Sequence, residues 1–273
     1  MTVLLTGATG FLGSYLAAQL PEPPCCVVRG AGPQARLDAA LAPLGASGVA
    51  VPGDVTRPLD VDLAGVTHIV HCAADVSFDR PLADARAINV AGARHVVELA
   101  RRAPALERLV HVSTAYVAGI APGRFRNSYE QSKHEAEEVV RAADVPYAIV
   151  RPSIVVGESR TGWTSSFNVL YPPLRALARG MIDTIPADPD AVVDVVPVDH
   201  VARVITAAMQ WSTGPGTLHA VAGDGALRAG ELAALAATEL GRHIPVLDPS
   251  GADLPPGGLE VYAPYVTVRT RFD

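Results

Sequence analysis

The sequence Val3-Leu4-Leu5-Thr6-Gly7-Ala8-Thr9-Gly10-Phe11-Leu12-Gly13 lies at the start of a chain of 273 residues and dictates much of its architecture. An apolar run predicts a strand, and glycines spaced G-x-x-G-x-x-G lead into a predicted helix. In such a unit the first glycine permits a tight turn, the second lets a pyrophosphate approach the backbone, and the third allows close packing of helix on strand. The helix N-terminus adds amide donors and a favourable dipole. The segment therefore predicts a dinucleotide site that includes Gly7, Thr9, Gly10, Phe11, Leu12 and Gly13.

Beyond this segment, short apolar runs alternate with helical patterns as far as about residue 150. Strands are predicted at 3–5, 25–28, 49–51, 68–71, 108–113 and 147–150, and helices at 11–20, 33–44, 81–102 and 128–142. This alternation predicts parallel strands joined by right-handed crossovers. We therefore expect an α/β fold, a Rossmann-type doubly wound parallel sheet that binds ligands at the carboxyl ends of its strands.

The regular alternation of predicted strands and helices ends after residue 151. Helices are predicted around 167–179, from a cap at Asp199 to about 211, and at 229–240, with strands at 192–196 and 217–221. We expect residues 1–155 to form the dinucleotide-binding core and 156–273 a smaller C-terminal substrate lobe, interleaved with the last core elements at about 192–221. An aromatic stripe in this lobe predicts packing inside it, or alternatively an acyl channel; its members are Trp163, Phe167, Leu170 and Tyr171.

The composition excludes several classes of protein. A net charge of -6 argues against a nucleic-acid partner, which normally leaves a basic footprint. Three cysteines, two of them adjacent, make no disulfide framework and are compatible with a reducing cytosol, so we expect a cytoplasmic protein. No signal peptide is expected, because the strand begins at once, and no apolar run approaches the length of a membrane span. The eight histidines are scattered without metal-binding spacing, so no metal is expected.

The end of the second strand indicates which cofactor is bound. NAD enzymes usually place an acidic residue there to bind the ribose hydroxyls. This chain has Arg29 instead, which can pair with a 2′-phosphate and so favours NADPH. Arg36 is a candidate for a second contact with the 2′-phosphate. Alternatively, Arg29 and Arg36 are solvated arginines on the surface. Asp54 and Val55, after the third strand, are candidates for the adenine pocket, with a simple turn aspartate as the alternative.

Tyr129 and Lys133 lie four residues apart on the predicted helix 128–142 and therefore share a face. A phenol titrates near pH ~10, and a nearby ammonium lowers that pKa by favouring the phenolate. The chain contains 21 arginines and a single lysine, so its lysine stands where a compact ammonium is useful. We expect Tyr129 to exchange a proton and Lys133 to support it and to bind the nicotinamide ribose. A chance pairing is the alternative.

Two neighbouring positions complete this predicted site. Thr114 follows the fifth strand and would present its hydroxyl to a substrate oxygen at the carboxyl edge of the sheet. Ser113 is the competing candidate. Asn89 lies on the preceding long helix, where it would anchor a proton-relay water or, alternatively, fix the backbone as a buried amide.

Together these residues resemble the extended branch of the short-chain dehydrogenase/reductase superfamily. The resemblance spans nearly the whole chain and is carried by TGATGFLG at 6–13, HCAA at 71–74, STAY at 113–116, RPS at 151–153, and Tyr129 with Lys133. Within that branch the chain is similar to the fatty acyl-CoA reductase and thioester reductase group, with its male sterility-type NAD-binding domains. That similarity is carried by residues 28–29, 126–133, 151–157 and 167–170.

The resemblance implies a catalytic triad of Thr114, Tyr129 and Lys133, and an NADPH site that also includes Ala73, Ala74, Pro152, Ser153 and Ile154. The implied reaction is hydride transfer to an acyl thioester, carried by coenzyme A or a carrier protein. The resulting hemithioacetal would collapse to an aldehyde and a thiol, and a second hydride transfer would give an alcohol. The alternatives are an NADPH-dependent carbonyl or hydroxysteroid-type reductase and a non-catalytic NADPH-sensing regulator. The implied assembly is a monomer or homodimer.

The chain departs from this pattern in two places. Thr114 and Tyr129 are only 15 residues apart, whereas extended members usually carry a longer insertion there. The family also tends to continue beyond the position of Asp273. We therefore expect a trimmed substrate gate, and either a smaller lobe or an incomplete chain.

Overall fold

The computed structural model describes residues 1–120, 123–167, 169–250, 265 and 272, and it divides the chain into two compact units. The first unit contains Met1–Pro152, Gly157–Ser165 and Pro197–Ala220. The second contains Ser153–Val156, Ser166–Val196 and Val221–Asp273. The chain therefore leaves the first unit after Pro152 and returns to it twice.

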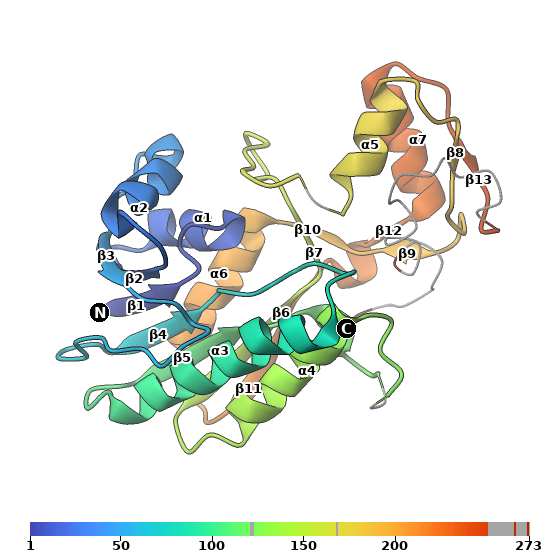
Figure 1. The fold of residues 1–273 in the computed structure, drawn as a ribbon. Coiled ribbons are helices and arrows are strands. Elements are labelled where there is room, and N and C mark those ends of the chain that lie inside the picture. The colour runs from blue at the N-terminus through green and yellow to red at the C-terminus, as the bar shows by residue number, and fades with distance from the viewer. Residues whose placement is uncertain (121–122, 168, 251–264, 266–271, 273) are drawn as a thin grey trace. The chain divides into compact units, whose positions relative to one another are not determined.

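A parallel sheet forms the centre of the first unit (Figure 1). In the described part of the chain, seven strands lie in the order β11-β6-β5-β4-β1-β2-β3. Their bounds are β1 (Val3–Thr6), β2 (Cys25–Val28), β3 (Val49–Pro52), β4 (His68–His71), β5 (Arg108–Val112), β6 (Tyr147–Pro152) and β11 (Gly216–Ala220). Neighbouring strands pair in parallel. The strand order reverses between β1 and β4, which is where a doubly wound sheet binds its ligand. The predicted fold class is thus confirmed.

Helices cover both faces of this sheet (Figure 1). One face carries α1 (Phe11–Gln19), α2 (Pro33–Leu41) and α6 (Val198–Met209), and the other carries α3 (Leu82–Arg102) and α4 (Ser128–Arg141). Two helix boundaries differ from expectation. The helix expected at 33–44 gives way to the 3₁₀ helix η1 (Ala42–Leu44), whose second residue is a proline. Asp199 lies in the first turn of α6 instead of capping it, because Pro197 is the N-cap.

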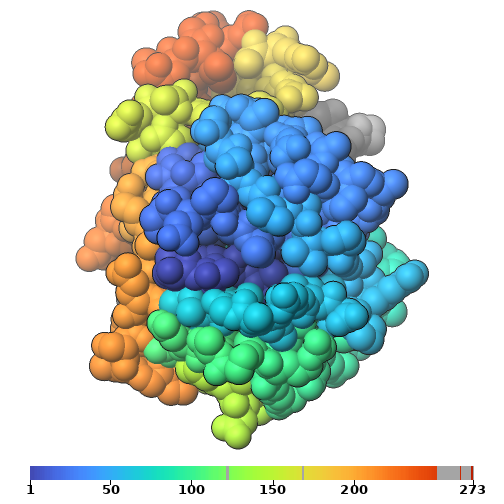
Figure 2. Space-filling model, turned by 90° about the vertical axis from the view of Figure 1, so that its left-hand side faces the viewer, coloured from blue at the N-terminus to red at the C-terminus, as the bar shows by residue number. Residues whose placement is uncertain are grey.

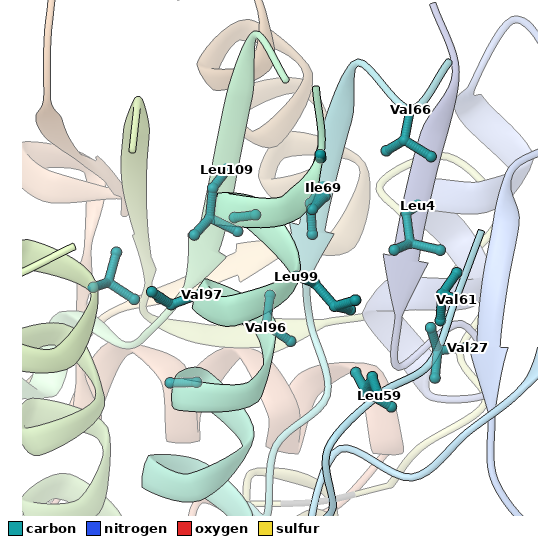
Figure 3. Close-up of a cluster of buried hydrophobic side chains, with 14 of the residues drawn as sticks. Leu4, Val27, Leu59, Val61, Val66, Ile69, Val96, Val97, Leu99 and Leu109 are labelled. Atoms are coloured by element: carbon teal, nitrogen blue, oxygen red, sulfur yellow. The ribbon is translucent and has the colours of Figure 1, made fainter. Parts of the chain in front are cut away.

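The core on the α3 side consists of apolar side chains in register across the strands. Leu4, Ile69 and Leu109 are paired positions on β1, β4 and β5, and each is fully buried. They pack against α3 residues that include Val96 and Leu99 (Figure 3). The burial of this apolar row stabilises the sheet two or three residues before its strands reach the carboxyl edge, where the predicted site lies.

The next row towards that edge is polar. Thr6 pairs with His71, and His71 pairs with His111, on the same face of the sheet as the apolar row. The Thr6 hydroxyl and His71 Nδ1 are 2.7 Å apart, and the two imidazole rings are 5.3 Å apart. The character of the core therefore changes from apolar to polar where the strands end.

The second unit is built from short strands and two helices. Its helices are α5 (Tyr171–Ala178) and α7 (Ala229–Leu240). Among the described residues, strands pair two at a time: β7 (Ile154–Val156) with β10 (Val195–Pro197), β9 (Val192–Val193) with β12 (Leu227–Arg228), and β8 (Thr184–Ile185) with β13 (Val246–Leu247). No helix in the described ranges is both long and apolar enough to cross a membrane.

Two expectations for this region are corrected. The strand expected at 192–196 is divided at Asp194, whose carboxylate accepts hydrogen bonds from the Ala222 and Gly223 amides (2.9 and 3.1 Å). Its two halves join small pairs, so β11 is the strand of 192–221 that extends the central sheet. The helix expected from 167 begins at Tyr171, where prolines in the first turn preset the helical backbone.

Candidate active site

The glycine turn between β1 and α1 has no room for side chains. Gly7 has φ +79°, and a Cβ atom there would lie 2.6 Å from the Ala73 nitrogen. A Cβ atom on Gly13 would lie 2.2 Å from the Gly7 carbonyl oxygen. The Gly10 amide donates to the same oxygen at 2.9 Å, which folds the turn under the start of α1. Because the first amides of a helix have no partner within it, this turn can hold a dinucleotide phosphate.

The predicted neighbours of this turn are close to it. Thr9 and Gly10 are exposed, and Phe11 and Leu12 begin α1. The Ala73 amide donates to the Thr6 hydroxyl at 3.2 Å, which holds the start of the 73–74 segment against the glycine turn. The residues present thus fit a dinucleotide along this edge.

The arginines predicted to select NADPH lie beyond the end of β2. Arg29 and Arg36 are exposed, and a Cβ atom on Gly30 would lie 3.6 Å from Arg36 Nη1. Asp54 forms a turn in which its carboxylate accepts from the Thr56 amide and hydroxyl, both at 2.9 Å. The Thr56 amide contributes most to lowering the pKa of Asp54, and Arg29 contributes to the same shift. Arg29 and Asp54 therefore lie near one another.

Val55 lies in the same turn. Its carbonyl oxygen and His95 Nδ1 are 2.7 Å apart, which ties the turn to α3.

The three predicted catalytic residues meet where β5 ends and α4 begins. Thr114 caps the 3₁₀ helix η2 (Ala115–Val117) by accepting from the Tyr116 amide (3.3 Å), and its side chain lies close enough to Tyr129 to act against the rise in the pKa of that phenol. Lys133, one turn after Tyr129, donates from Nζ to the Val112 carbonyl at 2.7 Å. Asn127 caps α4 by accepting from the Glu130 amide at 2.9 Å.

The acidity of Tyr129 differs from expectation. We expected the Lys133 ammonium to lower the pKa of the phenol. Instead, burial raises the pKa of Tyr129 to about 12, a hydrogen bond with Thr114 opposes the rise, and the Glu130 and Asp75 carboxylates add to it. Tyr129 is therefore a protonated phenol at neutral pH, ready to donate.

Lys133 is buried, with 2% of its surface exposed. Burial lowers its pKa to about 8, and the charge of the Glu137 carboxylate resists that change. His71 and His111 lie below it in the polar row, and burial and the Lys133 charge hold both of their pKa values far below the usual range. Since both imidazoles are neutral, Lys133 is the cation of this buried layer at neutral pH.

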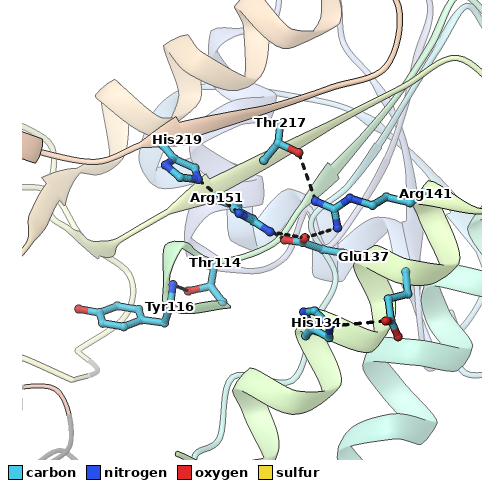
Figure 4. Close-up of polar contacts among 9 residues, drawn as sticks. Thr114, Tyr116, His134, Glu137, Arg141, Arg151, Thr217 and His219 are labelled. Carbon is cyan, nitrogen blue, oxygen red and sulfur yellow. Dashed lines mark hydrogen bonds and ion pairs between the residues drawn. The ribbon is translucent and has the colours of Figure 1, made fainter. Parts of the chain in front are cut away.

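Glu137, one turn beyond Lys133, is fully buried and binds two arginines (Figure 4). Arg151 from β6 donates to both carboxylate oxygens at 2.8 and 2.7 Å, and Arg141 donates at 2.8 Å. Glu137 was not among the site residues predicted from the sequence. The available signal was its spacing of four from Lys133 on the same face of the helix.

Four further residues were predicted to line the cofactor site: Asn89, Pro152, Ser153 and Ile154. Asn89 exchanges hydrogen bonds with the Asp75 backbone (2.8 and 3.0 Å) and donates to the Ser132 hydroxyl (2.9 Å), so its amide fixes the loop after β4 to α4. Pro152 ends β6 in the first unit, whereas Ser153 and Ile154 begin the second unit.

The aromatic stripe predicted in the lobe does not form. Trp163 belongs to the first unit and packs on Phe11 of α1. Phe167 is 54% exposed and contacts Tyr171 edge-on, with ring centroids 5.2 Å apart. Helical spacing misled the prediction because α5 begins only after both Trp163 and Phe167. Within the described ranges, no three His, Cys, Asp or Glu side chains are grouped to hold a metal ion.

Comparisons with known proteins agree with this geometry. The family model of the male sterility protein, an NAD-binding domain, matches residues 56–126 and 120–205. Fatty acyl-CoA reductase 1 of Homo sapiens is 31% identical over 285 residues, covering 77% of this chain and 54% of that protein. The chain thus spans about half the length of the curated relatives it matches.

Solved structures share the fold. The terminal R domain of the myxalamid PKS-NRPS biosynthetic pathway superposes with a TM-score of 0.72 at 26% identity, covering 97% of this chain and 89% of that one. MoeE5 in complex with UDP-glucose and NAD superposes with a TM-score of 0.70 at 23% identity, covering 91% and 85%. On the strength of the match over residues 56–205, this chain belongs to the male sterility protein family of NAD-binding domains.

Proposed function

We propose that this protein is an NADPH-dependent reductase that transfers hydride to an acyl thioester carried by coenzyme A or a carrier protein. The observation that carries the proposal is the placement of the Tyr129 phenol beside Thr114 and one helical turn before the buried Lys133. This arrangement lies at the carboxyl edge of a sheet whose glycine turn fits a dinucleotide. The similarity to fatty acyl-CoA reductase and to a terminal R domain supports a thioester as the substrate.

The residues divide the chemical work between them. The bound dinucleotide would supply the hydride. The Thr114 and Tyr129 hydroxyls would donate hydrogen bonds to the thioester oxygen, and Tyr129 would give that oxygen its proton as the carbonyl carbon is reduced. The C–S bond of the resulting hemithioacetal would then break, releasing an aldehyde and a thiol. Lys133 would bind the ribose hydroxyls and stabilise the phenolate left on Tyr129.

Stoichiometry tests this proposal directly. With a panel of acyl-CoA and acyl-pantetheine substrates, we expect NADPH oxidation accompanied by free thiol. One NADPH consumed for each thiol would identify an aldehyde product, and two would identify an alcohol. Reduction of ketones without any thiol release would favour a carbonyl reductase instead. Tight NADPH binding with no turnover on either class would favour a sensing protein.

The Arg29 side chain provides the test of cofactor choice. We expect Arg29→Ala to raise the KM for NADPH by about tenfold, because one charge-assisted contact to the 2′-phosphate is lost. The KM for NADH should stay within about twofold, since that cofactor has no such phosphate. Steady-state kinetics with both cofactors measure the difference. Arg94→Ala, which removes an exposed arginine of α3, is the matched control. An equal rise in the KM values for NADPH and NADH would overturn the assignment of Arg29 to the 2′-phosphate.

A further inference from the structure

Residues 157–165 form a loop that is closed on itself. The Glu158 carboxylate accepts from the Thr161 amide and hydroxyl at 2.7 and 2.6 Å, and the Glu158 amide donates to the Trp163 carbonyl at 2.9 Å. A Cβ atom on Gly157 would lie 2.6 Å from the Gly162 oxygen, so the two ends of the loop are in contact. The loop therefore keeps a defined shape although it contains no helix or strand.

Two anchors join this loop to the helices beside the glycine turn. Asp199 on α6 accepts from the Ser159 amide and hydroxyl, both at 3.0 Å. Trp163 packs on Phe11 and on Tyr15, with ring centroids 5.8 Å apart in each pair. Figure 2 shows this face, with the yellow-green segment lying against the blue N-terminal elements. Phe11 is the first residue of α1, so Trp163 lies over the turn proposed to hold the dinucleotide phosphates.

We infer that Trp163 is a cofactor-binding residue and that the 157–165 loop forms a wall of the dinucleotide site. The inference rests on the proposed function, because it assumes that a nicotinamide dinucleotide binds the glycine turn. An aromatic wall there excludes water from the first turn of α1, where hydrogen bonds between amides and phosphate gain strength from the lower dielectric. Trp163 also fixes Phe11, whose backbone amide belongs to that turn. This role was not predictable from the sequence, because the position of a residue in a loop does not indicate which helix its side chain packs against.

The chain has two tryptophans, so the fluorescence of single-tryptophan variants can test the inference. Trp211 follows α6, donates to the Thr213 carbonyl at 2.7 Å and packs beside Gly216, where β11 begins at the amino edge of the sheet. It therefore lies at the opposite edge from the glycine turn. In Trp211→Phe the remaining emission comes from Trp163, and in Trp163→Phe it comes from Trp211. Each variant is thus the matched control for the other.

We expect NADP⁺ to protect Trp163 from acrylamide quenching at least twofold in the Trp211→Phe variant, saturating at the Kd that calorimetry gives. In Trp163→Phe the emission of Trp211 should stay unchanged. NADP⁺ is the probe because it does not absorb tryptophan emission, and NAD⁺ serves as a second probe. Binding seen by calorimetry with no change at Trp163 would overturn the inference and leave the proposed function standing. Absence of any dinucleotide binding to the unmodified protein would overturn the proposed function itself.

Affinity gives an independent measurement. Trp163→Ala should weaken NADP⁺ binding about tenfold, the scale of one lost aromatic contact, and Trp163→Phe should restore most of it. Asp199→Asn should weaken binding several-fold through the loop anchor alone. Wild-type Kd values in both Trp163→Ala and Asp199→Asn, with folding shown by unchanged Tm, would contradict the role assigned to the loop.

Discussion

Tyr129→Phe is expected to lower kcat by about 10²- to 10⁴-fold, the usual contribution of a positioned general acid. The substitution removes the hydroxyl that lies beside Thr114 and would protonate the substrate oxygen. It keeps the ring, which packs against Phe78 with centroids 5.6 Å apart. The fold and the cofactor site should therefore survive. Single-turnover oxidation of NADPH with an excess of enzyme measures the chemical step.

The control for this prediction is another phenol in the same unit. Tyr147 lies at the start of β6, on the amino edge of the sheet and away from Thr114. Tyr147→Phe should keep turnover within about twofold, as surface or edge substitutions usually do. The Kd for NADPH should be unchanged in both variants. A Tyr129→Phe enzyme that turned over at the wild-type rate would refute the mechanism.

The glycine turn was predictable because its chemistry is local. Gly13 is required by its close contact with Gly7, and the positive φ of Gly7 belongs to the same strand–turn–helix unit, so the glycine spacing indicates both requirements. The close approach of Ala73 to Gly7 comes from a distant part of the chain and is not visible in that spacing. The capping bond of Asn127 is local as well, since it spans three residues. The sheet was predictable in outline as well, since alternating strands and helices leave few right-handed arrangements.

Properties set by distant parts of the chain were not predictable. The phenol of Tyr129 is less acidic than expected because burial outweighs any help from Lys133, and burial depends on how β5, η2 and α4 pack. The expected strand at 192–196 breaks because Asp194 binds amides 28 and 29 residues away. Trp163 was assigned to the lobe because local spacing does not reveal that its loop returns to α1.

Polar residues inside the sheet were the largest omission. Thr6, His71 and His111 occupy strand positions whose neighbours are apolar, so their pattern indicates only that the strands are buried. Their register across β1, β4 and β5 becomes evident only when the strand order is known. The structure places Tyr129 and Lys133 one turn apart on α4, as their spacing predicts, whereas the polar row across the strands becomes evident only in the tertiary structure.

Removing the Glu137 carboxylate is expected to destabilise the protein strongly. Glu137→Ala should lower the free energy of unfolding by about 3–5 kcal/mol, because breaking a buried pair leaves an uncompensated charge. That charge belongs to Arg151, which donates to both carboxylate oxygens of Glu137 and is mostly buried. Urea denaturation followed by circular dichroism measures the loss. Glu138→Ala is the matched control, since that side chain is 64% exposed, and its effect should stay within about 0.5 kcal/mol.

The same carboxylate makes stability depend on pH. Burial alone would raise the pKa of Glu137, but the hydrogen bonds and charges of Arg151 and Arg141 outweigh it and lower the pKa. A depressed pKa in the folded state stabilises the protein above the unfolded value of about 4.3, and that contribution is lost as the pH falls below it. The wild type should therefore lose stability on acidification more steeply than Glu137→Ala. If the free energy of unfolding fell in parallel with pH for the two proteins, the ion pair of Glu137 would contribute nothing to the pH dependence of stability.

Glu137 also connects this stabilising cluster to catalysis. Its charge raises the pKa of Lys133 against the effect of burial. In Glu137→Gln, which keeps an acceptor for Arg151 but no charge, Lys133 should lose its proton at a lower pH than about 8. Because a neutral lysine cannot stabilise the Tyr129 phenolate, the alkaline limb of kcat should move to lower pH while the folded protein persists. An unchanged limb in a stably folded Glu137→Gln enzyme would separate the two roles and assign Glu137 to the fold alone.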